Sequence, residues 1–395
     1  MKPKAAKIAV RRRSRPMRDM VADLADIFRE MPLEAKKPMD KGVAFLVALI
    51  TGFGVLMIWS ASMYNAKLSG NEFYYVEKQL QVAAIGFVAM YVMSLVNYQY
   101  LRRFAFPFLA LALGLLVVVL FTAEDVNGAG RWLRIFGFVI QPAELAKAAV
   151  MMFVAREIER KMELLPRFSG FLILLSFTGV VAVLIYMQPA LSTAIIVAGL
   201  IIGMYFMAGG NLLYIALMGV ISVSAIVTFI ASSKWRMARI LAYQNPWSDL
   251  AGKGWQPAQS LMALGSGGIF GQGIGNGKAK LMFLPEPQND YIFSVIGEEL
   301  GLIGCVTVIL VYFFLVFRLI KIALGTSDVF GRLLASGMGL LIAIQVFLNI
   351  AVVTNLIPPT GVMLPFISAG GSSLLTMLFS MGIVLNISRN VKSKT

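Results

Sequence analysis

Apolar runs of about twenty residues recur along the chain and alternate with short polar connections. A run of this length can cross the hydrocarbon core of a bilayer as one α-helix, and lipid cannot satisfy exposed backbone groups, so helices are the expected form. We therefore predict an all-α polytopic membrane protein with about ten transmembrane helices. The predicted spans lie near residues 42–62, 80–97, 104–122, 141–155, 169–187, 191–208, 211–231, 291–317, 331–353 and 361–386.

The polar connections predict how the helices are oriented. Basic residues gather in every second connection, at 97–103, 156–167 and 318–332, and in both terminal segments. Because basic loops remain on the cytoplasmic side, we expect both termini in the cytoplasm. The expected organisation is a basic N-terminal tail over 1–41, a transmembrane domain over 42–390 and a short C-terminal tail over 391–395.

One connection, residues 232–290, is much longer than the others and lies between the seventh and eighth predicted helices. The topology places it outside the cytoplasm. Loops of such length are usually functional or disordered. This one contains glycine-rich turns and a helix-like stretch, "PAQSLMALGSGGIF". We predict a structured extracytoplasmic loop that partly re-enters the membrane.

Composition agrees with a membrane protein and narrows the chemistry. Of 395 residues 58% are hydrophobic and 14% charged, and the mean hydropathy is +0.79, far too apolar for a soluble domain of this size. With no histidine and one cysteine, Cys305, His-based metal sites and an intramolecular disulfide are excluded, and we predict no metal site. The net charge of +15 is concentrated in the N-terminal tail. We expect that tail to contact anionic membrane lipids and not nucleic acid.

Ionisable residues inside membrane spans are costly, so each is a candidate functional residue. The first cluster, residues 127–147, contains Arg131 and Arg134 in an outer loop and Glu144 and Lys147 one turn apart on a helix face. An alternative is that Glu144 and Lys147 only neutralise each other.

Two further clusters lie on the same outer side. Gln188 occupies the tight turn "MQPALS", where a plain proline turn is an equal explanation. Asp290 stands at the membrane edge before the eighth span, and an N-cap role explains it equally well. Glu298 and Glu299 follow about two turns deeper, and we expect them to brace a cavity wall.

The fourth cluster, residues 355–379, combines prolines, glycines and serines, among them Ser368 and Ser372. Small residues can serve helix packing, but irregular backbone at membrane depth also lines wet cavities. The run "GQGIGNGKAK" is not a nucleotide-binding loop, because Gln272 and Ala279 stand where that motif needs Gly and Ser or Thr. Lys280 in this run is a candidate contact for an extracytoplasmic anion.

Taken together, these residues predict an outward-facing cavity with cations from Arg131 and Lys147 and one acid, Asp290. A ligand with an anionic head and a membrane-embedded tail suits such a cavity. A lipid-linked pyrophosphate is of this kind, since Arg and Lys bind phosphates.

At these residues the chain resembles the SEDS family of peptidoglycan polymerases, FtsW and RodA, over about residues 42–390. The similarity rests on "NGAGRWL…QPAELAK", "LPEPQNDYIFSVIGEELG" and "PPTGVMLPFISAGGSSLL". The ending "GIVLNISRN" and the basic tail look closer to FtsW, the division enzyme, than to RodA.

The resemblance implies an inverting glycosyltransferase that polymerises lipid II and releases undecaprenyl pyrophosphate. It implies Asp290 as general base and Arg131, Lys147 and Glu144 as substrate-binding residues. Gln188, Lys280, Ser368 and Ser372 complete the predicted binding set. A resident cofactor is not required, although a divalent cation bridging pyrophosphate and Asp290 is compatible with the sequence.

The resemblance also implies partners and a location: a class B penicillin-binding protein, other divisome proteins, the bacterial inner membrane and the division septum. Two positions depart from the family pattern, because Ala190 replaces an aspartate and Ala369 a tyrosine. A lipid II flippase and a non-catalytic divisome scaffold are the alternative functions. The outer location of the polar clusters favours the enzyme over the flippase.

Overall fold

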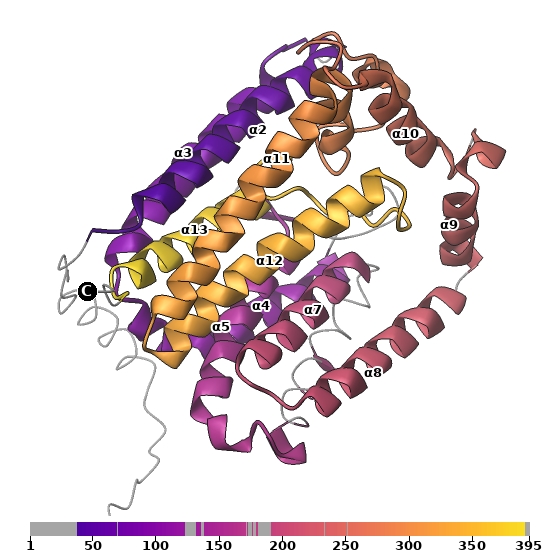
Figure 1. Ribbon diagram of the computed structural model, residues 1–395. Helices are drawn as coiled ribbons and strands as arrows, with labels where there is room; N and C mark the ends of the chain where they lie inside the picture. The colour runs from indigo at the N-terminus through magenta and orange to yellow at the C-terminus, as the bar shows by residue number, and fades with distance from the viewer. Residues whose placement is uncertain are drawn as a thin grey trace, which may run out of the picture.

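The computed structural model describes residues 38–68, 70–122, 132–135, 138–170, 172, 176, 179–180, 191–232, 234–250 and 252–391. Within these residues the protein is a bundle of long apolar helices, as predicted (Figure 1). The basic tail 1–37, Arg131, Gln188 and Ala190 lie outside the described residues, so the predictions made for them are not addressed by the structure.

Each predicted span except the fifth, which falls largely outside the described residues, coincides with a described helix. Six of the described helices are long and apolar enough to cross a membrane, and α7 and α8 are shorter apolar helices. The helix α5 contains the charged residues Glu144 and Lys147, which made its span the weakest prediction. The helices are α2 (Lys41–Leu68), α3 (Tyr74–Leu95), α4 (Leu101–Thr122), α5 (Pro142–Arg160), α7 (Leu191–Met207), α8 (Leu212–Ala231), α11 (Ile292–Gly325), α12 (Val329–Val353) and α13 (Gly371–Ser388).

The tenth span begins later than predicted. Its helix α13 starts at Gly371, not near residue 361, because the preceding segment has irregular backbone. Gly361 and Phe366 both adopt positive φ angles, of 70° and 64°, which no α-helix accommodates. Residues 355–370 therefore form a non-helical segment at the end of the bundle.

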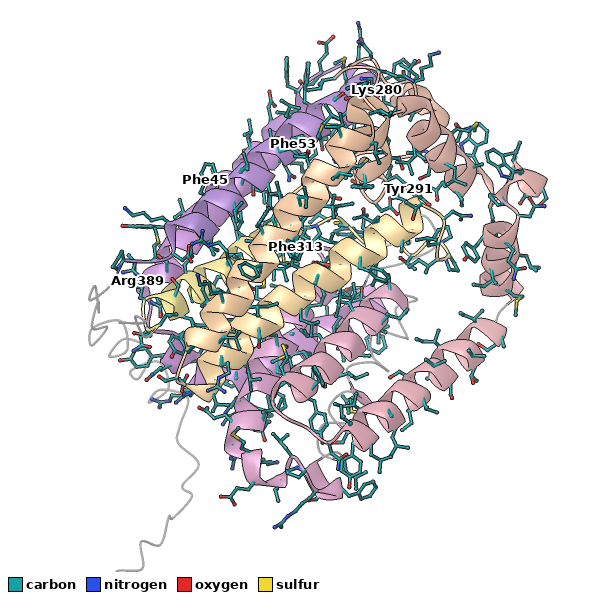
Figure 2. All side chains as sticks on the ribbon, viewed as in Figure 1. Phe45, Phe53, Lys280, Tyr291, Phe313 and Arg389 are labelled. Carbon is teal, nitrogen blue, oxygen red and sulfur yellow. The ribbon has the colours of Figure 1, made fainter. Side chains whose placement is uncertain are left out.

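The interior of the bundle is formed mainly by α5, α12 and α13, and 15 of the 19 residues of α5 are buried. In the membrane windows of α12 and α13, 67% and 72% of residues are buried, whereas the figure for α11 is 17%, so α11 presents most of its surface to the surroundings. Figure 2 labels Phe45 on α2 and Phe313 on α11, and both side chains are more than half exposed, as lipid-facing side chains are. α13 packs closely on α3, since a Cβ at Gly382 would lie 2.4 Å from the carbonyl oxygen of Met90.

The long connection 232–290 is structured, as the sequence predicted. Its predicted helix is α10 (Trp255–Gly267), which packs against α11. The short elements were not predicted: the antiparallel strands β1 (Leu133–Ile135) and β2 (Phe138–Ile140) before α5, the helix α9 (Lys234–Gln244), and the turns η1 (Tyr98–Tyr100), η2 (Met162–Leu164), η3 (Pro246–Asp249) and η4 (Ala279–Phe283).

α11 is interrupted at Gly301, which has φ 66° and ψ −164°. The interruption frees backbone groups of α11, and the loop that follows α10 pairs with them. Two amides of the loop donate to carbonyls of α11, and two amides of α11 donate to carbonyls of the loop. The four bonds are Gln272 N to Glu298 O (3.0 Å), Gly273 N to Glu299 O (2.9 Å), Leu302 N to Gly268 O (2.9 Å) and Ile303 N to Ile269 O (3.2 Å).

Candidate functional site

Asp290 lies in the turn immediately before α11, and its backbone is held by α12. The buried Asn349 of α12 donates from Nδ2 to the carbonyl oxygen of Asp290 (2.7 Å) and to that of Val362 (2.7 Å). One amide group therefore fixes the turn before α11 to the irregular segment after α12. Asn349 was not among the predicted site residues, although an amide within an apolar run is itself a signal of a polar contact between helices.

The carboxylate of Asp290 lies beside the turn at Gly361. A Cβ at Gly361 would lie 3.7 Å from Oδ2 of Asp290, and the residue is neither fully buried nor fully exposed. α11 starts at Ile292 and Tyr291 occupies the cap position, so Asp290 stands one residue before the cap. Asp290 thus precedes the helix and lies against residues that are distant in the sequence.

Ser368 and its neighbours join the irregular segment to the same turn. The hydroxyl oxygen of Ser368 accepts a hydrogen bond from the amide of Leu364 (2.8 Å), and the amide of Ala369 donates to the carbonyl of Gln288 (2.9 Å). Ser368 is 4% exposed. Its hydroxyl supports the fold of the segment, and its predicted contact with substrate stays a prediction.

Ser372 joins α13 to the start of α5. Its hydroxyl accepts from the amide of Gln141 (3.0 Å) and donates to the carbonyl of Val139 (3.0 Å). Because Gln141 is the N-cap residue of α5, this serine fixes the helix end next to Glu144 and Lys147.

Glu144 and Lys147 form a buried ion pair with an O–N distance of 2.7 Å. Their side chains are 10% and 3% exposed. The i, i+3 spacing predicted this geometry. A pair of this kind neutralises both charges inside the bundle.

The structure thus brings most of the predicted residues to one end of the bundle. Asp290 contacts the segment around Gly361 and Ser368, and that segment leads to Ser372, which contacts the start of α5. Figure 2 shows Lys280 and Tyr291 at this end and Arg389 at the opposite end. A chain of contacts through the irregular segment and Ser372 therefore links the turn of Asp290 to the start of α5. The expected convergence of Asp290, Lys147 and Arg131 in one cavity stays a prediction, because Arg131 lies outside the described residues.

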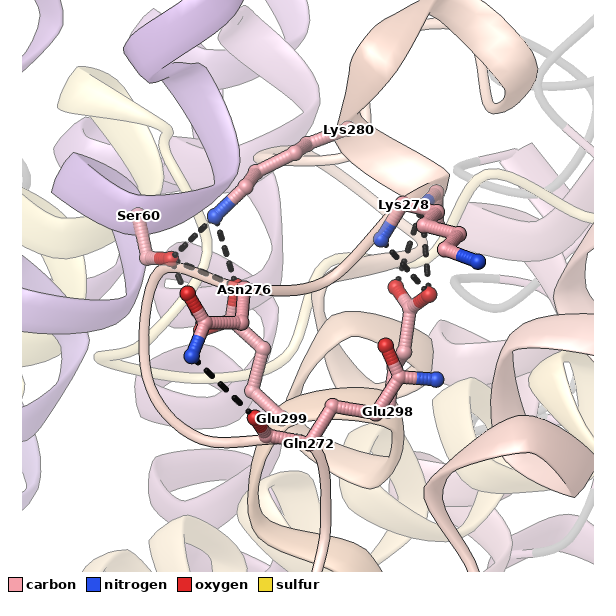
Figure 3. Close-up of polar contacts among 8 residues, drawn as sticks. Ser60, Gln272, Asn276, Lys278, Lys280, Glu298 and Glu299 are labelled. Carbon is pink, nitrogen blue, oxygen red and sulfur yellow. Dashed lines mark hydrogen bonds and ion pairs between the residues drawn. The ribbon is translucent and has the colours of Figure 1, made fainter.

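Lys280 is not exposed to solvent, contrary to the expectation that it faces an anion outside the cell. It is 4% exposed, and its ammonium group lies 2.9 Å from Oε1 of Glu299 and 3.2 Å from the hydroxyl of Ser60 (Figure 3). Ser60 in turn donates to both carboxylate oxygens of Glu299 at 2.7 Å. This cluster ties the long loop to α2 and α11.

The side chain of Glu298 binds the backbone of the long loop. Its carboxylate accepts from the amides of Lys278 (2.7 Å) and Ala279 (3.0 Å), as Figure 3 shows for the loop around Lys278. The glycine-rich run therefore directs its amides to a carboxylate of the same chain. The two acids hold the long loop against α11, a more specific role than the cavity bracing predicted for them.

Within the described residues, no group of three or more His, Cys, Asp or Glu side chains is arranged to hold a metal ion.

The fold defines a polytopic helical membrane protein, and one end of its bundle brings together the buried pairs Glu144–Lys147 and Glu299–Lys280 and the turn of Asp290. The family model of FtsW, RodA and SpoVE, described as cell cycle proteins, matches residues 41–393. The chain belongs to this family.

Curated relatives extend over nearly the whole chain. It is 43% identical to the probable peptidoglycan glycosyltransferase FtsW of Trichlorobacter lovleyi, covering 89% of this chain and 94% of the relative. It is 38% identical to stage V sporulation protein E of Bacillus subtilis, with coverages of 90% and 98%.

Solved structures confirm the fold. RodA of Thermus thermophilus is 25% identical, with a TM-score of 0.67 and coverages of 90% of this chain and 98% of that chain. A chain from a study titled "Structural coordination of polymerization and crosslinking by a peptidoglycan synthase complex" is 25% identical, with a TM-score of 0.74 and coverages of 90% and 99%.

Proposed function

We propose that this protein is a peptidoglycan glycosyltransferase that polymerises lipid II at the division septum and releases undecaprenyl pyrophosphate. The observation that carries the proposal is the position of Asp290, a carboxylate in the turn immediately before α11 whose backbone is fixed by Asn349 and whose side chain lies beside Gly361. The names of its relatives support the same reaction.

In the proposed reaction Asp290 acts as general base. Its carboxylate removes the proton from a sugar hydroxyl, the hydroxyl oxygen forms a bond to the anomeric carbon of a second sugar, and the bond from that carbon to pyrophosphate breaks. A direct displacement of this kind inverts the anomeric carbon. A positioned general base contributes roughly 10²–10⁴-fold to such a rate.

Cations of the site stabilise the departing pyrophosphate. Lys147 is the described candidate, with Glu144 orienting its ammonium group at 2.7 Å, and Arg131 is the second cation implied by the family motif. Gln188, Ser368 and Ser372 complete the proposed binding set. Lys280 positions the long loop through its ion pair with Glu299. The proposed reaction has no step on a metal ion.

One departure from the family pattern is compatible with activity. At Ala369 the hydrogen bond to Gln288 is made by the backbone amide, so it does not depend on the side chain.

For the cellular setting we propose the bacterial inner membrane, with both termini in the cytoplasm and Asp290 at the outer face. The orientation follows from the basic loops. A class B penicillin-binding protein is the proposed partner, and the synthase complex among the structural relatives supports it. Further divisome proteins are proposed from the similarity to FtsW.

The test is glycan synthesis by the purified full-length protein together with its penicillin-binding partner and labelled lipid II. We expect Asp290→Asn to reduce polymer formation by at least roughly 10²-fold, because the base is lost while the shape is kept. Glu286→Gln is the matched control, since it removes an exposed acid of the same loop and should keep activity.

Equal activity of wild type and Asp290→Asn would contradict the proposed role of this residue. If the wild-type protein makes no polymer but scrambles lipid II in liposomes, the flippase alternative is correct. If it does neither and still binds its division partners, the scaffold alternative is correct.

A further inference from the structure

A basic cavity lies at the end of the bundle opposite Asp290. Its volume is about 450 Å³, and it lies between the start of α4 and the end of α5. It is lined by Arg103, Phe106, Pro107, Phe153, Arg156, Glu157, Arg160 and Lys161. None of these residues has a part in the proposed glycosyltransferase reaction.

The cavity has more cations than its own acid neutralises. Four of the lining side chains are Arg or Lys and one is Glu. Glu157 is shared between Arg160 at 3.8 Å and Lys161 at 3.3 Å. Among the described residues Arg156 takes part in no ion pair. The cavity therefore attracts an anion.

Among the described residues, two acids beside the cavity are directed to another cation. Glu159 and Asp328 both pair with Arg102, with a distance of 2.9 Å from Arg102 to Glu159, and that arrangement joins α4, α5 and α12 beside the cavity. The surplus positive charge thus remains on the cavity side of α5, where a ligand can meet it.

The other wall of the cavity is apolar and faces lipid. Phe106 is 56% exposed, Pro107 is also exposed, and the ring of Phe106 lies 6.3 Å from that of Phe153. Only 28% of the membrane window of α4 is buried. An acyl chain can therefore lie along α4 while a headgroup occupies the basic part.

We propose that this cavity binds the phosphate headgroup of an anionic glycerophospholipid from the cytoplasmic leaflet. Basic cavities between transmembrane helices on the cytoplasmic side bind such headgroups, and arginine forms paired hydrogen bonds with phosphate. The apolar wall favours a lipid over a free phosphate ester. The site is independent of the glycosyltransferase proposal and uses only the orientation given by the basic loops.

The test uses the full-length protein in detergent, titrated with phosphatidylglycerol or with phosphatidylethanolamine of the same acyl chains, and bound lipid is counted by native mass spectrometry. We expect one phosphatidylglycerol to bind in preference to phosphatidylethanolamine. In Arg156→Gln/Arg160→Gln its affinity should fall roughly tenfold or more. Arg156→Lys/Arg160→Lys should keep most of the binding.

Lys41→Gln/Lys321→Gln is the matched control, because it removes two exposed basic residues at the same end outside the cavity. The melting temperature of each variant shows that it is folded, and Arg156→Gln alone is the milder variant. Equal binding of the two lipids, or an equal loss in the control, overturns the proposal. Displacement of the lipid by soluble glycerol phosphate would instead assign the cavity to a free phosphate ester.

Discussion

Two buried carboxylates of the bundle are each paired with a lysine. Glu144 pairs with Lys147, and Glu299 pairs with Lys280 and Ser60. The first pair is local, so helical spacing predicts it from the sequence. The second joins residues from three elements, and no local pattern contains it. For the same reason the contacts of Asp290 with Asn349 and Gly361 were not predictable, although the importance of Asp290 was.

At the residue scale, Lys280→Ala should lower the free energy of unfolding by about 3–5 kcal/mol, because Glu299 is left as an unpaired buried charge. The double variant Lys280→Met/Glu299→Leu should recover much of this loss, since it removes both charges and keeps apolar volume. Denaturation of the purified protein in detergent, analysed as a double-mutant cycle, measures the coupling.

The same variants distinguish two possible roles of Lys280, positioning of the loop and contact with substrate. If the stabilised double variant still polymerises lipid II, the lysine acts through loop position. If stability recovers and lipid II binding does not, the lysine contacts substrate, as the sequence originally suggested.

At the scale of elements, α11 has an interruption that the pattern of apolar residues does not predict. Its apolar pattern predicted one continuous span near 291–317, and the helix is instead interrupted at Gly301 and extends to Gly325. The interruption depends on four backbone bonds from residues 268–273, which side-chain hydrophobicity does not encode. The helices themselves were predictable because each is an apolar run long enough to cross a bilayer.

Gly301→Ala should destabilise the protein strongly. A Cβ at this position would lie 2.4 Å from the amide nitrogen of Gly271 and 2.5 Å from the carbonyl oxygen of Ile269, and φ is 66°. We expect a loss of roughly 2 kcal/mol or more, since both the strain and the lost backbone pairing contribute.

Gly265→Ala in α10 is the matched control, because nothing lies within 4 Å of a Cβ there. It should be neutral or slightly stabilising. Melting temperatures in detergent compare the two variants, and equal values would show that the loop adapts to a continuous α11.

At the scale of the whole molecule, the two ends of the bundle differ in chemistry. Figure 2 shows Tyr291, which follows Asp290, and Lys280, which pairs with Glu299, at one end and Arg389 at the other. The basic cavity at the start of α4 lies near Arg389, since Asn386 accepts a hydrogen bond from the amide of Tyr98 just before α4. Beyond the interruption at Gly301, the part of α11 that runs to Gly325 has 24 residues (302–325) and is about 36 Å long at 1.5 Å per residue, so this part alone is longer than a hydrocarbon core of about 30 Å. The distribution of charged residues along the sequence predicted that the two ends of the bundle differ in this way.

The orientation is tested with single cysteines in a Cys305→Ala background. Glu286→Cys and Ser327→Cys place exposed thiols before and after α11. In cells whose outer envelope is permeabilised and whose inner membrane is intact, a membrane-impermeant maleimide should label the cysteine at position 286 and not the one at position 327. The reverse pattern would place Asp290 in the cytoplasm and remove the basis for lipid II polymerisation.

The interruption of α11 also has a consequence for synthesis of the chain. Residues 268–273, which pair with the opened helix, precede it, and so does Ser60. The partners of the two opened carbonyls and two opened amides of α11 are therefore already synthesised when α11 leaves the ribosome. Asn349 and Gly361 emerge later, so the surroundings of Asp290 are completed only when the last two helices have been inserted.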